Sequence, residues 1–369
     1  MDRILLRILP AFCILMAGQV SRAQTSGDTR PAYQSLKGTI DKYPVTMNLH
    51  RKGTEYFGSY YYDRVGEPIT LTGTEEGGVI RLSSFKANGM ETFELSRGTE
   101  GFTGNWKPDT DKPTLSTSLS VNKDALALNS FHSADSFKLR SSGTESPKCE
   151  SDVYTVWPAG NSTRDAFIKQ RIRAALDKEK KFSADPAVML TQKNMKYLND
   201  YKNAMKTEKE EDFRDRPSSY SWDWIESVSV IYSSPTILSL DHMQWEYSGG
   251  AHGNGASIYK VLDLKNQKEL KLSDVITPGG MKPVLKLEEK YLRRKAGLKT
   301  SQPLKDAGLY ENSIGKVSDI FYVTDKGVCF SYTPYDIGPY SSGQIEIFVP
   351  YTELKPHLQP SFVKLMGIK

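Results

Sequence analysis

Short runs of alternating apolar and polar residues recur from residue 33 to residue 140, separated by glycines, Asn88 and charged residues. A strand with one buried face alternates in this way, and no helical period appears here. The runs are GTIDKYPVTMNLH, YFGSYYY, PITLTG, GVIRLSSF, METFELS, GFTGNWK and TLSTSLS. Their even spacing predicts an all-β antiparallel meander, curled into a barrel or a strongly bent sheet.

The pattern changes to a helical period after residue 150. Ser162 and Asp165 match a capping box, and an apolar stripe follows it, which predicts a helix. A second helix is predicted from Ala187 to about Lys209. The residues predicted near one face of that helix are Val188, Gln192, Met195, Leu198, Tyr201 and Met205.

Three β-like runs come next, WDWIESVSVIYSS, TILSLDHMQWEYS and ASIYKVLDL. The last two flank the glycine-rich stretch Gly249–Gly255 and predict a hairpin with that stretch at its tip. Residues 150–369 are therefore predicted to form an α+β domain, a mainly antiparallel sheet with helices packed on one face. Its helical first part covers about 150–232, and a hairpin, helix and strands cover 233–358. The small-residue stretch 141–148 is the expected boundary with the β-rich domain at 33–140.

The N-terminus has the pattern of a cleaved secretory signal. Arg3 and Arg7 precede an apolar run, and small residues at Ser21 and Ala23 precede Gln24. The apolar run is well short of the roughly 20 residues that span a bilayer. We expect residues 1–23 to be removed, no membrane span to remain, and the mature protein to be periplasmic or secreted.

Composition narrows the class of protein. The chain has 38% hydrophobic and 25% charged residues, which is typical of a folded globular protein. The net charge of +5 is too small and too dispersed to predict nucleic-acid binding. Cys149 and Cys329 would remain after signal cleavage, and they are either one disulfide or two buried thiols. No metal or cofactor is expected.

The stretch WEYSGGAHGNGA contains His252, one of five histidines. An imidazole there could act as a general base with a carboxylate, Asp263 being the first candidate by residue type and Asp241 and Glu246 others. It could also bind a metal together with His242. The alternatives are a tight loop in which glycines supply positive φ, or a binding loop that a partner approaches closely. The binding candidates in the hairpin are Tyr247, Gly249, Gly250, His252 and Gly253.

A second unusual stretch is SYTPYDIGPYSSGQ, in which Tyr332, Tyr335 and Tyr340 alternate with prolines and glycines. Tyrosines on a rigid loop form a contact surface for sugars or proteins, or cover a sheet edge. The chain has no His-Glu-x-x-His, no Gly-x-Ser-x-Gly and no phosphate-binding loop, so whether it is an enzyme stays open, with a non-enzyme favoured.

YSGGAHGNGASIYKVLDLKNQKELKLSDVI and GVCFSYTPYDIGPYSSGQIEIFVPYTEL resemble the RsiV-like domain family over about residues 154–358. The resemblance rests on the loop Gly249–Gly253, on Asp263 and Asp274, and on the closing stretch from Tyr335 to Tyr351. In that family one anti-sigma factor binds lysozyme, and a related region stands beside the catalytic domain of a peptidoglycan deacetylase.

The resemblance implies a recognition module of the bacterial cell envelope. The expected ligand is a peptidoglycan-like glycan or a lysozyme-like protein, bound without catalysis. One alternative is an envelope hydrolase that uses His252 with Asp263 or Asp336, and another is a structural module of an assembly.

Overall fold

The structure is a computed structural model that describes residues 32–86, 89–108, 112–140 and 145–369. The expected signal segment 1–23 lies outside these ranges. Among the described residues, no helix is both long and apolar enough to cross a bilayer.

The first eight strands form a closed antiparallel barrel in which each strand pairs with its sequence neighbour and β1 pairs with β8. Alternate residues point inward, and the core includes Leu36, Met47, Leu71, Phe93 and Leu119. The strands are β1 Tyr33–Ile40, β2 Tyr43–Lys52, β3 Glu55–Tyr62, β4 Ile69–Glu76, β5 Val79–Lys86, β6 Gly89–Arg97, β7 Gly101–Pro108 and β8 Leu115–Val121. The all-β meander predicted from the sequence is confirmed, and it closes fully.

A six-stranded sheet follows, in the order β14-β13-β12-β11-β10-β9. All its pairs are antiparallel except β10 with β11. Its strands are β9 Leu128–Lys138, β10 Lys148–Pro158, β11 Trp222–Ser233, β12 Ile237–Tyr247, β13 Asn254–Asp263 and β14 Lys268–Glu269. Strand β9 lies within the predicted β-rich region 33–140, but its hydrogen bonds are to β10, so the barrel ends at Val121.

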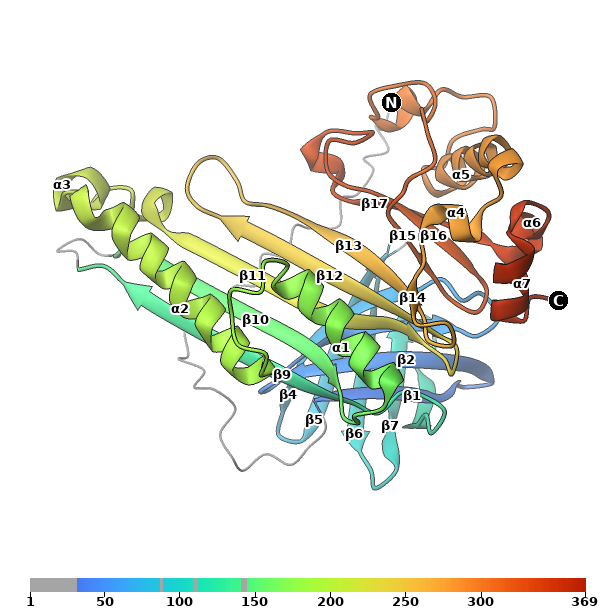
Figure 1. Ribbon diagram of the computed structural model, residues 1–369, viewed down its shortest axis with the longest axis horizontal. Coiled ribbons are helices and arrows are strands. Elements are labelled where there is room, and N and C mark those ends of the chain that lie inside the picture. The colour runs from blue at the N-terminus through green and yellow to red at the C-terminus, as the bar shows by residue number, and fades with distance from the viewer. Residues whose placement is uncertain (1–31, 87–88, 109–111, 141–144) are drawn as a thin grey trace.

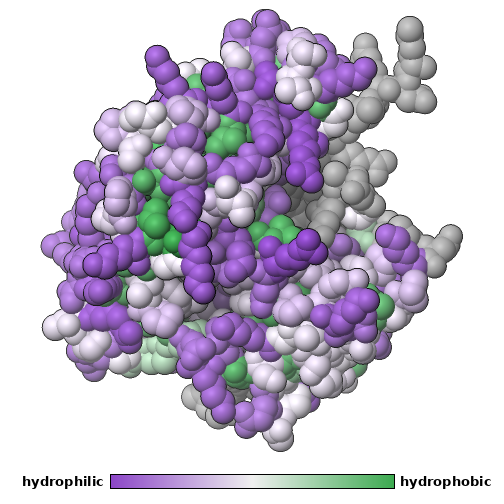
Figure 2. All heavy atoms as spheres, turned by 90° about the vertical axis from the view of Figure 1, so that its right-hand side faces the viewer, coloured by the Kyte–Doolittle hydropathy of each residue, from purple (hydrophilic) through white to green (hydrophobic). Residues whose placement is uncertain are grey.

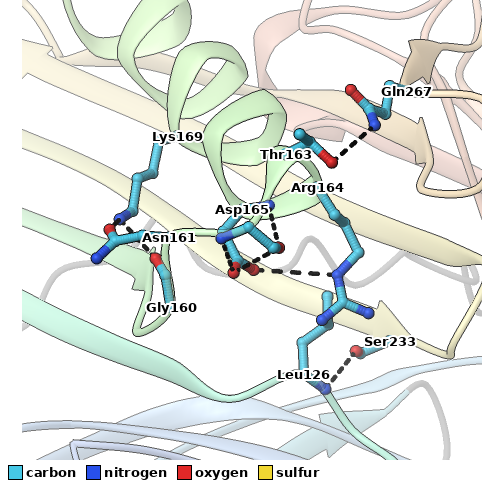
Figure 3. Close-up of polar contacts among 10 residues, drawn as sticks. Leu126, Gly160, Asn161, Thr163, Arg164, Asp165, Lys169, Ser233 and Gln267 are labelled. Carbon is cyan, nitrogen blue, oxygen red and sulfur yellow. Dashed lines mark hydrogen bonds and ion pairs between the residues drawn. The ribbon is translucent and has the colours of Figure 1, made fainter.

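Two helices, α1 Thr163–Leu176 and α2 Pro186–Ala204, lie across one face of this sheet, and the barrel lies behind it (Figure 1). The capping box predicted for α1 is present: Asp165 N donates to Ser162 Oγ and Ser162 N donates to Asp165. Figure 3 shows this helix start, with Arg164 against Asp165 and Lys169 folded back on Gly160 and Asn161. The α+β architecture predicted from the sequence is confirmed.

The orientation predicted for α2 is wrong in part. Val188 and Met195 were predicted near the same face as Leu198 and Tyr201, which are buried, yet Val188 and Met195 are 46% and 54% exposed. Lys193 and Asn194 are buried in their place. Asn194 donates to Ser133 Oγ on β9, and Lys193 pairs with Glu226 on β11. The buried face of α2 therefore includes Lys193 and Asn194, and Val188 and Met195 lie outside it.

The C-terminal part is a small antiparallel sheet of β15 Phe321–Val323, β16 Gly327–Tyr332 and β17 Ile345–Pro350. It packs against β12 and β13, where Ser239 Oγ donates to Val323 O at 2.8 Å. The remaining helices are α3 Glu210–Phe213, α4 Leu272–Val275, α5 Met281–Lys295, α6 Tyr351–Leu354 and α7 Pro360–Met366. Figure 2 shows the end of the molecule where α4 to α7 lie, opposite to α3, and hydrophobic residues appear there as separate patches among hydrophilic ones.

Cys149 and Cys329 are free thiols, which corrects the disulfide alternative. Cys149 is buried with Leu198 and Tyr201 beneath α2. Cys329 is buried in the separate core of the C-terminal part. A disulfide needs Cα atoms within about 7 Å of each other, which two different core clusters do not provide.

Candidate functional site

The predicted hairpin is present, with β12 and β13 paired from Ile237 and Asp263 to Glu246 and Asn254. Its tip holds Gly249 and Gly250 at φ of 95° and 93°, a region that glycine occupies without strain. Tyr247 Oη donates to the Gly250 carbonyl at 3.1 Å, across the loop. The tip is thus a defined turn whose conformation depends on these glycines.

Gly253 is a glycine for a different reason, the close approach of a ring. A Cβ on this residue would lie 2.4 Å from Trp245 Cζ2 and 2.9 Å from the Glu246 carbonyl oxygen. Its own carbonyl accepts hydrogen bonds from Tyr340 Oη at 2.6 Å and His252 Nδ1 at 2.8 Å. Gly253 therefore contacts the Trp245 ring on one side and binds Tyr340 and His252 through its carbonyl.

The two stretches singled out in the sequence meet at this point. The exposed His252 ring stacks on Tyr340 with centroids 3.9 Å apart and planes 17° apart. The ring centroid of Tyr335 lies 5.9 Å from that of Tyr340, and Tyr335 is 51% exposed. Its φ of 75° is unfavourable for a residue with a side chain, and such strain clusters at binding and catalytic sites. The three rings form a row at the end of the sheet, in which His252 and Tyr335 are exposed and Tyr340 is half-buried.

The loop that carries these tyrosines is fixed to the sheet edge. Gln344 Oε1 accepts from Ser257 N at 2.7 Å, and Gln344 Nε2 donates to Ser257 O at 2.9 Å, so one side chain pairs with β13 as a strand would. Asp336 accepts from Thr333 N and Oγ1 at 2.7 and 2.8 Å. These contacts hold the ring row in a preformed geometry.

Tyr332 does not belong to the ring row, contrary to its prediction as a binding residue. Its ring is 4% exposed, and its hydroxyl donates to Glu288 on α5. Burial raises the pKa of the Glu288 carboxyl to about 8. Tyr332 is therefore part of the core of the C-terminal part.

A cleft of about 400 Å³ opens beside the ring row, between the hairpin and the loop after β16. Its lining combines aromatic residues with amide and carboxylate residues, the mixture that orients a polar organic ligand. The residues that form it include Trp224, Gln244, Trp245, Glu246, Asn254 and Pro334.

This cleft was not predicted from the sequence, although all three β-like runs contribute residues to it. Trp224 and Glu246 are cross-strand partners, as are Glu226 and Gln244. Only the register between the first and second β-like runs places these side chains on one face. The sequence shows the alternation within each run, but it does not show which residues of neighbouring strands pair.

The predicted acid–base pair is not assembled. Asp263 lies at the opposite end of β13 from His252, where it accepts from Lys265 N and Asn266 N and shapes a turn. Asp336 is engaged with Thr333. Burial raises the pKa of Asp241 to about 7, where it faces Ser257 and Glu346. The described polar contact of the His252 ring is a backbone carbonyl.

The alternative metal pair is not assembled either. His242 Nε2 lies 2.9 Å from Glu226 Oε1, beneath α2 and away from the hairpin tip. Within the part of the chain that the structure describes, no group of three or more His, Cys, Asp or Glu side chains is arranged to hold a metal ion. The arrangement around His252 suits binding by stacking and hydrogen bonding.

Replacing Gly253 with alanine is expected to displace the Trp245 ring and to lower the free energy of unfolding by about 1–3 kcal/mol, as overpacking does. Chemical denaturation followed by tryptophan fluorescence measures both effects. Gly315→Ala is the matched control, because a Cβ there meets nothing within 4 Å. Equal stability of the two variants would contradict the close approach.

Two parts of the chain match family models. Residues 148–255 match the model described as "Deacetylase PdaC", and residues 273–352 match "Protein of unknown function (DUF3298)". The first range contains His252 and Gly253, and the second contains Tyr335 and Tyr340. The ring row therefore forms where the two matched ranges meet. The finer resemblance to the RsiV-like family stays a prediction.

One solved structure of a DUF3298 family member is similar in fold to this chain. The crystal structure of a family member from Bacteroides fragilis NCTC 9343 is 23% identical, with a TM-score of 0.58 over 67% of this chain and all of that one. A structure from Pseudomonas aeruginosa PAO1 is 18% identical over 63% of this chain and 95% of that one, with a TM-score of 0.42. A search of curated proteins finds no match to this chain.

Proposed function

We propose that this chain is an exported cell-envelope protein that binds a glycan without catalysis, in the cleft beside the ring row. The observation that carries the proposal is the preformed row of His252, Tyr340 and Tyr335 next to a cleft whose lining includes Trp224 and Trp245. Aromatic faces stack on sugar rings, while amides and carboxylates bind hydroxyl groups.

The envelope setting is supported by two observations of different kinds. The N-terminal pattern of residues 1–23 is that of a secretory signal. The match of residues 148–255 to a deacetylase family model associates this part with proteins of the envelope. A peptidoglycan-like glycan is the ligand that fits both the setting and the walls of the cleft.

Tyr335→Asn is expected to weaken binding of an N-acetylglucosamine tetramer by roughly threefold to tenfold, because it removes one exposed ring. Asparagine tolerates positive φ, so the free energy of unfolding is expected to stay within about 0.5 kcal/mol. Isothermal titration calorimetry measures the binding, and chemical denaturation the stability.

Tyr43→Asn is the matched control, since Tyr43 is 47% exposed on the barrel. Titration with lysozyme tests a protein ligand in the same instrument. Binding of lysozyme without binding of the tetramer would contradict the glycan proposal and would indicate a protein ligand. Turnover of the tetramer that disappears in His252→Ala would contradict a non-catalytic role.

A further inference from the structure

We infer that the glycan site is bipartite: a second cleft beneath α2 adjoins the first, and the two together take a linear, uncharged glycan longer than one sugar ring. This inference rests on the proposed function and extends the same site. It predicts a chain-length dependence that a single cleft would not produce.

The second cleft has a volume of about 380 Å³, close to that of the first. It lies between the sheet and the connection from α1 to α2. Phe182 and Tyr197 supply aromatic walls, and Glu226 lies at its floor on β11. Both volumes are within the range of small-ligand sites.

Trp224 and Gln244 line both clefts, so they form the boundary between them. They come from neighbouring strands and lie on the face of the sheet that carries α2, since Trp224 pairs with Glu246 and Gln244 with Glu226. A ligand that leaves one cleft along the sheet enters the other across the Trp224 ring.

The shared boundary is held from below by a buried network. Gln244 Nε2 donates to Glu226 Oε1 at 2.7 Å, and Glu226 pairs with Lys193 at 2.7 Å. The Lys193 ammonium lies 5.5 Å from the Trp224 ring centroid, and the Tyr197 ring lies 5.3 Å from it. Groups fixed before binding reduce the entropy lost when a ligand binds.

The charges around the clefts indicate an uncharged chain. Four lysines and four acidic residues line the second cleft, and the first adds Glu246. Three pairs already neutralise each other, Lys181 with Glu179, Lys196 with Asp200 and Lys193 with Glu226. Without a cationic excess the site does not favour a polyanion.

The test is calorimetric titration of the full chain with N-acetylglucosamine oligomers from one to six units. Affinity is expected to rise about tenfold or more between the dimer and the tetramer and then to level off. Linked contacts in adjoining clefts produce such a gain, because the second contact forms at high effective concentration. A sulfated polysaccharide, heparin, is expected not to compete.

Phe182→Ala removes a wall of the second cleft only, and it is expected to reduce tetramer affinity to that of the dimer without changing dimer affinity. Tyr43→Ala is the control, and thermal unfolding checks that both variants fold. Dimer and tetramer binding with equal affinity would overturn the bipartite site while the proposed function stands. Absence of binding by every oligomer would overturn the proposed function and this inference with it.

Discussion

Replacing Glu226 with alanine is expected to lower the free energy of unfolding by about 3–5 kcal/mol, because it leaves the Lys193 ammonium buried without a carboxylate. The Glu226 side chain has no exposed surface, and that of Lys193 is 9% exposed. Burial alone would raise the pKa of Glu226, but hydrogen bonding from His242 and the charge of Lys193 hold it below its usual value. The carboxylate is therefore ionised at neutral pH, and its loss leaves an unpaired charge.

The matched control is the double variant Lys193→Met/Glu226→Gln, which removes both charges and keeps the volume. It is expected to recover most of the lost stability, since replacing a whole buried ion pair is often neutral. Urea denaturation of Lys193→Met, Glu226→Gln and the double variant measures the coupling between the residues. Additive losses would show that the pair is not energetically linked.

The local features of the site could be predicted from the sequence. The capping box depends on residues three positions apart, and the hairpin depends on two alternating runs around a glycine-rich turn. Both features depend on residues that are close in the sequence, so a single sequence is enough to predict them.

The features that were not predicted depend on partners that are far apart in the sequence. The buried face of α2 carries Lys193 and Asn194 because Glu226 and Ser133 lie beneath it on two strands. The apolar content of the helix gave no sign of these partners. Tyr340 and Gly253 are likewise 87 positions apart and meet only after the loop has folded onto β13.

The contact between the barrel and the sheet was also not predicted from the sequence. It is centred on His50 of β2, one of five histidines in the chain. Its ring is fully buried between Tyr33 and Phe57, with centroids at 4.8 and 5.0 Å. Nδ1 lies 2.9 Å from Tyr154 Oη. Nε2 accepts from Val230 N at 3.2 Å, the shorter of its two contacts with that residue. An imidazole that accepts at Nε2 and donates at Nδ1 is neutral.

This burial predicts that the protein loses stability in acid through His50. Burial lowers the pKa of the imidazole from 6.5 to about 3. The unfolded chain therefore binds a proton near pH 6.5, while the folded chain does not until about pH 3. The stabilising contribution is complete above pH 6.5 and decreases as the pH falls through this window, by roughly 1.4 kcal/mol per pH unit.

The measurement is the difference in unfolding free energy between the native chain and His50→Gln, taken by denaturation from pH 7 to pH 4. Asp241 and Glu288 titrate with the opposite sign, because their raised pKa values favour the folded state in acid. Both groups are present in the two proteins and cancel in the difference. The variant is expected to start less stable, through lost ring packing, and to approach the native chain as the pH falls. A constant difference across this range would mean that His50 is protonated in the folded state.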